Sequence, residues 1–418
     1  MKLFDVIAIL LTLTALLSYF NHRYIRLHPS IGVMLVALLL SLALIGLGQL
    51  GLGIRSAARD FMQHIHFGDA LLTWMLGFLL FAGALTVDIS ELRRQWQVTT
   101  LLATVGTAAS MFIVAALMHR GIGLMGMSLP WTGCLLFGAL ISPTDPVAVV
   151  AVTRQAGAGK SIDTVVSSES LLNDGVGVVL FLTILHAAAA PGGATVSGVL
   201  IMLVRETCGG AILGFCTGLI IYHFLKNVQN FQVEVLLTLA LVMGTYSLAA
   251  ALGMSAPIAV VVAGLLIGNR GKIFHLADQV NADLERFWEL IDEVLNSVLF
   301  VLMGVEVLVM PYTARHFLAA LLAIPIVLVA RAAAVAATVG LLPLRPRVGW
   351  PTAAILIWGG LRGGLAVAMA LSLPEGPERD LIVAITYGVV CFSILVQGTT
   401  IKQLVQRTIL FSPGRRHK

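Results

Sequence analysis

The sequence predicts an all-α polytopic membrane protein, and three observations support that fold class. Hydrophobic residues make up 58% of the 418 residues and charged residues only 11%, whereas an ordinary soluble domain carries roughly 25% charged residues. Apolar runs of about 20 residues, long enough to cross a bilayer as a helix, recur along the whole chain. Two of these runs are interrupted near their middle by proline or glycine.

Hydropathy predicts about thirteen spans in total. The first begins at Leu3 and lacks the small-residue cleavage site of a signal peptide, so we interpret it as a retained helix. The span near Ser255 is the shortest. The predicted spans begin near Leu3, Ile31, Ala70, Val98, Trp131, Asp163, Thr195, Gln232, Ser255, Phe287, Arg315, Trp350 and Asp380.

The basic residues predict the orientation of these spans. Lys and Arg concentrate in one set of alternate loops, which includes Arg154, Lys160 and the short tail 411–418. The positive-inside rule places this set in the cytoplasm, so the net charge of +5 is not a nucleic-acid signal. We expect a multi-pass cell-membrane protein with a cytoplasmic C-terminus and, for an odd number of spans, an external N-terminus. The four cysteines form no Cys-x-x-Cys pair, so neither a zinc site nor a disulfide framework is indicated.

The two interrupted spans occupy corresponding places in the chain. In the fifth span Pro143 and Pro146 flank Thr144 and Asp145, and in the twelfth span residues 359–364 read Gly-Gly-Leu-Arg-Gly-Gly. If six spans on each side of the seventh form two halves of opposite orientation, both interruptions are fifth in their half. Such a pattern points to an inverted-repeat transporter with a site at mid-membrane.

Oxygen-bearing side chains gather at the fifth and sixth spans. A helix end exposed by the prolines carries a positive dipole, so Asp145 is expected to cap it and shape the site. Thr144 offers a hydroxyl. Because Pro146 disrupts the local pattern of backbone hydrogen bonds, Thr144 also offers a free carbonyl. Ser170 and Asp174 lie one helical turn apart and share a stripe. We predict that Asp174, Ser170 and Thr144 form an oxygen cage for a small monovalent cation.

A neighbouring stripe of the sixth span carries Glu169 and Asn173. A charge at mid-membrane costs roughly 2.5–3.5 kcal/mol on insertion scales, so such residues are normally paired or line a water-filled path. We predict a structural ion pair between Glu169 and Arg362, which lies at the break in the twelfth span. Glu306 and Arg331 are interpreted as a separate interhelical pair.

Three further features have ordinary structural explanations. His186 and His223 lie near span ends and are interpreted as surface histidines, although either could sense pH. The run 288–293, Trp-Glu-Leu-Ile-Asp-Glu, has the tryptophan and charges expected at the membrane interface.

These motifs together resemble the NhaP-type branch of the sodium/proton antiporters, the electroneutral branch that includes the animal sodium/hydrogen exchangers. The matching pieces are residues 142–146 (Ser-Pro-Thr-Asp-Pro), 169–175 (Glu-Ser-Leu-Leu-Asn-Asp-Gly) and 358–364 (Trp-Gly-Gly-Leu-Arg-Gly-Gly). The resemblance covers about the whole transmembrane chain. It implies a thirteen-helix homodimer in which the two discontinuous helices cross near the membrane centre.

The resemblance also implies how the chain is divided. Core transport helices would lie within residues 97–190 and 311–410, and scaffold and dimerisation helices within 1–96 and 191–310. The tail 411–418 lacks the long regulatory domain of the animal exchangers.

Specific roles follow from the same resemblance. Asp174 would be the essential ion-binding aspartate, with Ser170 and Thr144 as co-ligands of Na⁺, and we predict Asn173 as the fourth residue of the cation- and proton-binding site. Asp145 would be the carboxylate at the crossing, and Glu169 and Arg362 the structural ion pair. One departure concerns the third span, where some archaeal members carry a glutamate and this chain has Ala82.

The predicted function is exchange of Na⁺, and also Li⁺, for H⁺, with roles in sodium transport and pH homeostasis. Asp174 would bind either ion but never both, and Asn173 cannot titrate, so one H⁺ should move per Na⁺ without net charge. No cofactor is expected beyond the transported ions. The alternative within transport is K⁺/H⁺ exchange, because the ligand set does not fix the size of the cage.

Two other classes of protein fit less well. An intramembrane aspartyl protease would need a Gly-x-Gly-Asp element, whereas residues 175–178 read Gly-Val-Gly-Val. A passive channel would not require a cation site that excludes the proton. We therefore predict a transporter and not an enzyme.

Overall fold

The computed structural model describes residues 3–27, 29–48, 75–156, 160–189, 196–226, 228, 230–269, 282–309, 313–341 and 349–410. Throughout these ranges the chain is helical or forms short connections, and the one strand-like pairing is an isolated antiparallel bridge between Asp145 and Leu361. The predicted all-α class is confirmed.

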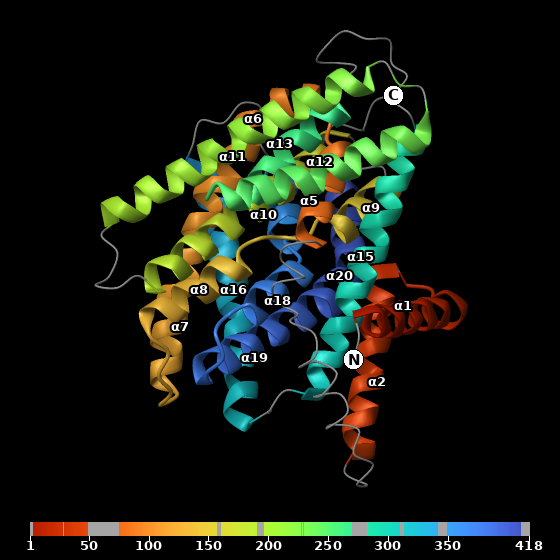
Figure 1. The fold of residues 1–418 in the computed structure, drawn as a ribbon. Helices are drawn as coiled ribbons and strands as arrows, with labels where there is room; N and C mark the ends of the chain where they lie inside the picture. Colours follow the sequence, from red (N-terminus) through yellow and green to blue (C-terminus); the bar gives the residue numbers. More distant parts are fainter. Residues whose placement is uncertain are drawn as a thin grey trace.

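The helices follow one another closely along the chain (Figure 1). In the first half these are α1 (Leu3–Phe20), η1 (Asn21–Ile25), α2 (Pro29–Gly48), α5 (Leu76–Thr86), α6 (Ile89–Leu101), η3 (Leu102–Gly106), α7 (Thr107–Leu124), α8 (Trp131–Ile141), α9 (Val147–Ala156) and α10 (Lys160–Ala189). The second half contains α11 (Val196–Leu225), α12 (Phe231–Ala251), α13 (Ala256–Gly268), α15 (Ala282–Val309), α16 (Ala314–Leu341), α17 (Trp350–Trp358), α18 (Gly364–Leu371), α19 (Pro377–Phe392), η4 (Ser393–Gln397) and α20 (Gly398–Leu410).

Six helical stretches in the described ranges are long and apolar enough to cross a membrane. They are Ile89–Leu124, Ile162–Ala189, Ser197–Leu225, Phe231–Ala251, Ala314–Gly340 and Pro377–Thr408. Shorter apolar helices include Leu76–Thr86, Trp131–Ile141 and Ala256–Gly268. The predicted starts near Trp131 and Trp350 match the first residues of α8 and α17. The count of thirteen spans stays a prediction, because residues 49–74, 270–281 and 342–348 lie outside the described ranges.

One group of helices packs through small residues. Helix α13 lies between α11 and α5, and a Cβ atom added to Gly214 of α11 would overlap the carbonyl of Ala259. On the other side of α13, a Cβ atom at Gly268 would overlap the carbonyl of Leu85. Helix α2 runs beside α15, where the Ser41 hydroxyl donates to the Gly304 carbonyl oxygen. Small residues let helix backbones approach closely, which is how membrane helices gain packing energy without a hydrophobic driving force.

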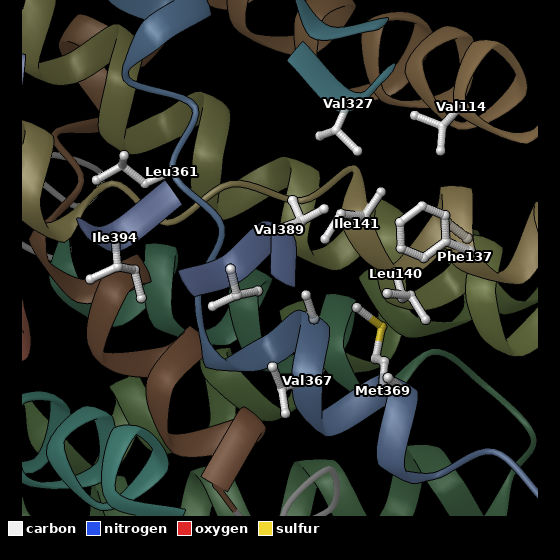
Figure 2. Close-up of a cluster of buried hydrophobic side chains, with 14 of the residues drawn as sticks. Val114, Phe137, Leu140, Ile141, Val327, Leu361, Val367, Met369, Val389 and Ile394 are labelled. Carbon is white, nitrogen blue, oxygen red and sulfur yellow. The ribbon is translucent and has the colours of Figure 1, made fainter. Parts of the chain in front are cut away.

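A second group surrounds the interrupted helices. Helix α16 packs against α7 and α19, and α18 packs against α19. Figure 2 shows the apolar side chains between them, with Phe137 and Leu140 of α8 near Met369 of α18. Phe137, Leu140 and Met369 are fully buried. This cluster holds the half-helices α8 and α18 in place although each is only about two to three turns long.

Candidate cation-binding site

Both predicted helix interruptions are present, and they touch each other. Residues 142–146 separate α8 from α9, and residues 359–363 separate α17 from α18. The backbone N–H of Asp145 donates to the carbonyl oxygen of Leu361 at 2.8 Å. An extended backbone segment at membrane depth is tolerated only when protein or water satisfies its polar groups. Each interruption therefore helps to satisfy the other.

Thr144 is the centre of a buried hydrogen-bond cluster formed with α10. Its N–H donates to Asn173 Oδ1 at 3.1 Å, and its hydroxyl oxygen accepts from Asn173 Nδ2 at 2.8 Å. The hydroxyls of Thr144 and Ser170 lie 3.1 Å apart. Thr144, Ser170 and Asn173 are all buried. Three of the four residues predicted to bind the cation are thus in direct contact with one another.

Asn173 has little capacity left for a cation. Its amide nitrogen also donates to Glu169 Oε1 at 2.9 Å, and its oxygen is taken by the Thr144 N–H. The amide therefore fixes Thr144 relative to α10.

Asp174 opens onto a cavity of about 460 Å³. Thr144 and Asp145 line this cavity with Asp174, whereas Ser170 and Asn173 lie behind Thr144 and do not line it. The cavity thus brings Asp174 together with the two residues at the centre of the first interruption.

Asp145 lies where the first interrupted segment, residues 142–146, approaches the start of α18. A Cβ atom added to Gly363, the residue before α18, would sit 2.9 Å from Asp145 Oδ2. The N-terminus of a helix carries partial positive charge from its free N–H groups, which favours a nearby carboxylate. Asp145 therefore lies beside the start of α18, whereas its predicted capping of a helix end in its own span stays a prediction.

The predicted ion pair between Glu169 and Arg362 is wrong. Glu169 instead pairs with Arg331 of α16, whose Nη1 and Nη2 donate to the two carboxylate oxygens at 2.8 and 3.0 Å. The Glu169 side chain is only 1% exposed. A planar guanidinium that meets a carboxylate with two parallel bonds gives a strong, directional pair. Arg331 also donates to the Leu356 carbonyl oxygen near the end of α17.

Arg362 performs a different task from the predicted one. Its Nη1 donates to the carbonyl oxygens of Ser142 and Pro143, just after α8 ends. Carbonyls at the C-terminus of a helix lack intrahelical partners and carry partial negative charge, so a cation is favourable there. The sequence could not distinguish the two arginines, because both lie within spans and Arg331 is 162 residues from Glu169.

The acidic lining of the cavity was missed by sequence reasoning. Glu289, Asp292, Glu293 and Asn296 of α15 line the cavity that contains Asp174. Their spacing of three and four residues places them on one helix face. This spacing is the feature of the sequence from which an acidic helix face could have been predicted.

The neighbouring tryptophan corrects our interpretation of the run 288–293. Trp288 is 1% exposed, packs against Phe78 and Phe81, and donates from Nε1 to the Thr238 hydroxyl at 3.2 Å. It is therefore a core residue. The acids that follow it on α15, Glu289, Asp292 and Glu293, line the cavity.

The remaining sequence candidates lie away from the cavity. Ala82 is buried against a cluster that includes Phe81 and Val242, while the next residue, Gly83, lines the cavity. His186 and His223 are exposed in the last turns of α10 and α11.

Comparison with known proteins places this site in a family. Residues 9–407 match the family described as "Sodium/hydrogen exchanger, transmembrane". The chain is 45% identical over 414 residues to the Na⁺/H⁺ antiporter NhaP of Pseudomonas aeruginosa, with 98% of each chain covered. It is 31% identical over 380 residues to the Na⁺/H⁺ antiporter NhaH of Halobacillus dabanensis, covering 89% of this chain and 91% of that relative.

A solved structure shares the fold. The sodium proton antiporter MjNhaP1 from Methanocaldococcus jannaschii superimposes with a TM-score of 0.76 at 19% sequence identity, covering 98% of this chain and 100% of that one. The resemblance to NhaP-type antiporters is confirmed, and these relatives are transporters rather than enzymes. The chain is therefore a membrane protein that belongs to the sodium/hydrogen exchanger family.

Proposed function

We propose that this protein exchanges Na⁺, and also Li⁺, for H⁺ across the membrane, with Asp174 carrying either ion. One observation carries the proposal: Glu169 and Asp174, the two carboxylates in the middle of α10, have opposite surroundings. Glu169 is buried and held by Arg331 and Asn173, whereas Asp174 lines the cavity beside Thr144. The relatives' printed activity, Na⁺/H⁺ antiport, supports the same substrates.

The proposed cation ligands are oxygen atoms at the edge of this cavity. Asp174 would supply the charge, and the Thr144 hydroxyl and carbonyl the neutral oxygens. Ser170 would act through its contact with the Thr144 hydroxyl, or bind directly after a rotation of its side chain. Hard oxygen donors suit a small monovalent cation. Asn173 would hold Thr144 in place.

The coupling of Na⁺ movement to H⁺ movement would follow from the charge of the Asp174 carboxylate. Asp174 with either Na⁺ or H⁺ is neutral, so the loaded site can move through the apolar interior. The empty carboxylate would carry its charge into a low-dielectric barrier, which is expensive. Uncoupled movement is thereby suppressed, and an inward proton gradient can drive Na⁺ out.

Access to the site would come from the cytoplasm. The cavity includes Arg154 near the end of α9, and the positive-inside rule assigns the loop after Arg154 to the cytoplasmic side. Acidic side chains of α15, including Glu289 and Glu293, line the same cavity. Their negative potential would concentrate cations near Asp174.

Alternating access would involve movement of one helix group against the other. Helices within residues 97–190 and 311–410 would carry the site, and those within 1–96 and 191–310 would form the scaffold of a homodimer. The close packing of α13 with α5 and α11 supports a rigid scaffold. Exposed apolar residues on α11, including Ile212 and Phe215, would face lipid or the second copy.

The test is exchange in proteoliposomes. An imposed pH gradient should drive cation uptake, and added cation should dissipate the gradient, for Na⁺ and Li⁺. The series should also include K⁺, with protein-free liposomes as the control. Activity with K⁺ but not Na⁺ would replace the proposal with K⁺/H⁺ exchange. Sodium movement without any coupled change in pH would indicate a channel and overturn antiport altogether.

A further inference from the structure

Three polar side chains of η4 and α20 form hydrogen bonds with residues 358–362, at the second interruption. The π-helical turn η4 and the start of α20 carry Ser393, Gln397 and Thr400. The Ser393 hydroxyl accepts from the backbone N–H of Arg362 at 2.9 Å. Gln397 Nε2 donates to the Trp358 carbonyl oxygen at 2.9 Å, and Trp358 Nε1 donates to the Thr400 hydroxyl at 2.9 Å. These bonds hold both ends of residues 358–362.

The need for such bonds arises from the broken helix. Residues 359–363 lie between α17 and α18, and the Gly359 N–H still donates to the Ile355 carbonyl oxygen at 2.7 Å. Peptide groups beyond that last helical bond require other partners. Ser393 accepts from the Arg362 N–H, Gln397 donates to the carbonyl of Trp358 at the end of α17, and both side chains are buried. A π-helical turn inside an α-helix shifts the residues that follow it around the axis, and such turns occur frequently at functional sites.

These hydrogen bonds connect to the candidate cation site through Arg362. Ser393 holds the backbone of Arg362, and the Arg362 side chain holds the carbonyls of Ser142 and Pro143. The next residue is Thr144, the centre of the buried oxygen cluster. Gln397 also lines a cavity of about 10 Å³ with Arg331 and Arg362, so it lies at the junction of both arginines.

We propose that Ser393 and Gln397 are positioning residues for cation binding: Ser393 fixes Arg362 and Gln397 fixes Trp358, and the segment 358–362 held between them positions Thr144 through the Arg362 side chain. Neither residue is among the described residues that line the cavity containing Asp174. The effect on transport rests on the proposed antiport function, whereas the effect on the two interrupted segments does not. Without these bonds, the segment 358–362 would sample several positions, and the oxygen cluster around Thr144 would lose its fixed geometry.

The test compares Ser393→Ala and Gln397→Met with a matched control, Thr386→Val. Thr386 is a fully buried residue on the preceding helix α19, and its hydroxyl donates within its own helix, to the Ile382 carbonyl oxygen at 2.7 Å. Each test variant should raise the half-saturating Na⁺ concentration about five-fold, the effect of losing one buried hydrogen bond, while the maximal rate changes less. Thr386→Val should leave the half-saturating concentration unchanged.

A second measurement is independent of transport. Hydrogen–deuterium exchange of residues 142–147 and 358–364 should be faster in Ser393→Ala and Gln397→Met than in the wild type or Thr386→Val. Unchanged exchange in residues 142–147 would overturn the positioning role, whatever the transport result. If the wild type fails to exchange Na⁺ for H⁺ but both segments loosen, the proposed function fails and the positioning of the Thr144 segment stands. Equal Na⁺ dependence in all three variants of a working antiporter would refute the link to cation binding.

Discussion

At the scale of single residues, surroundings separate two carboxylates that lie five positions apart on one helix. Glu169 is enclosed by the Arg331 guanidinium and the Asn173 amide. Asp174 lines a cavity of about 460 Å³ beside Thr144. Under the proposed function, Glu169 is a fixed structural charge, and Asp174 is the carboxylate that alternates between proton and cation.

Replacing Asp174 by Asn should abolish exchange while the protein still folds. The amide has nearly the same shape, but it cannot take up and release a proton and binds cations weakly. The measurement is Na⁺-dependent dissipation of a pH gradient by purified protein in liposomes. Thr183→Val, which alters a buried side chain on the same helix, provides a control for expression and folding. Exchange by Asp174→Asn near the wild-type rate would refute the role of Asp174.

The ion pair between Glu169 and Arg331 should dominate local stability. Removing either partner leaves an uncompensated buried charge, at a cost of roughly 3–5 kcal/mol. Glu169→Gln and Arg331→Met should each lower thermal stability, and the double variant should lose less than the sum. The same cycle with Arg362→Met should show weaker coupling to Glu169, because Arg362 bonds to backbone carbonyls instead. Stronger coupling to Arg362 than to Arg331 would contradict the observed pairing.

At the scale of helices, the sequence predicts the interruptions but not their partners. Pro143, Pro146 and the glycines of residues 359–364 break helices for local reasons that one sequence reveals. The arginine that reaches Glu169 depends on how α16 packs against the rest of the fold, which no local pattern encodes. Hydropathy likewise marks Trp288 as interfacial, whereas its indole donates to Thr238 inside the core.

Close approach of α10 to the first interruption gives a prediction about glycine. A Cβ atom at Gly177 would overlap the Pro143 ring, whereas a Cβ atom at Gly175 would meet Ile258 Cγ1 at an ordinary contact distance of 3.7 Å. Gly177→Ala should therefore destabilise the protein by about 1–3 kcal/mol through overpacking and should also reduce exchange. Gly175→Ala should be neutral or stabilising by about 0.5–1 kcal/mol, since alanine favours a helix. Thermal unfolding of both variants in detergent tests this, and equal stability would show that α10 does not press on Pro143.

At the scale of the whole molecule, several acidic side chains gather around one cavity in an apolar protein. The cavity beside the two interruptions contains Asp174, Asp145 and the acidic face of α15. Composition predicted a membrane protein, and the motifs predicted Thr144, Ser170 and Asp174 as neighbours of the break. The acidic face was not predicted, because Glu289 and Asp292 come from a helix far along the chain. Its contribution to the cavity is a property of the assembled fold.

The same arrangement sets the expected stoichiometry. Asn173 cannot titrate, Glu169 is paired with Arg331, and Asp145 lies beside the start of α18. Asp174 alone then alternates its cargo, so one H⁺ should move for each Na⁺. An exchange that moves no net charge gives the membrane potential no leverage, whereas one net charge would be worth ~2.3 kcal/mol per 100 mV.

Potential dependence tests this central claim most directly. Purified protein in liposomes would be held at equal pH on both sides, with a potential set by valinomycin and K⁺, while the equilibrium Na⁺ ratio is measured. The prediction is a Na⁺ ratio that stays at one at every potential, with valinomycin-free liposomes as the control. A Na⁺ ratio that follows the potential would contradict one-for-one exchange and would point to a second proton carrier among Asp145, Glu169 and the acids of α15 that line the cavity.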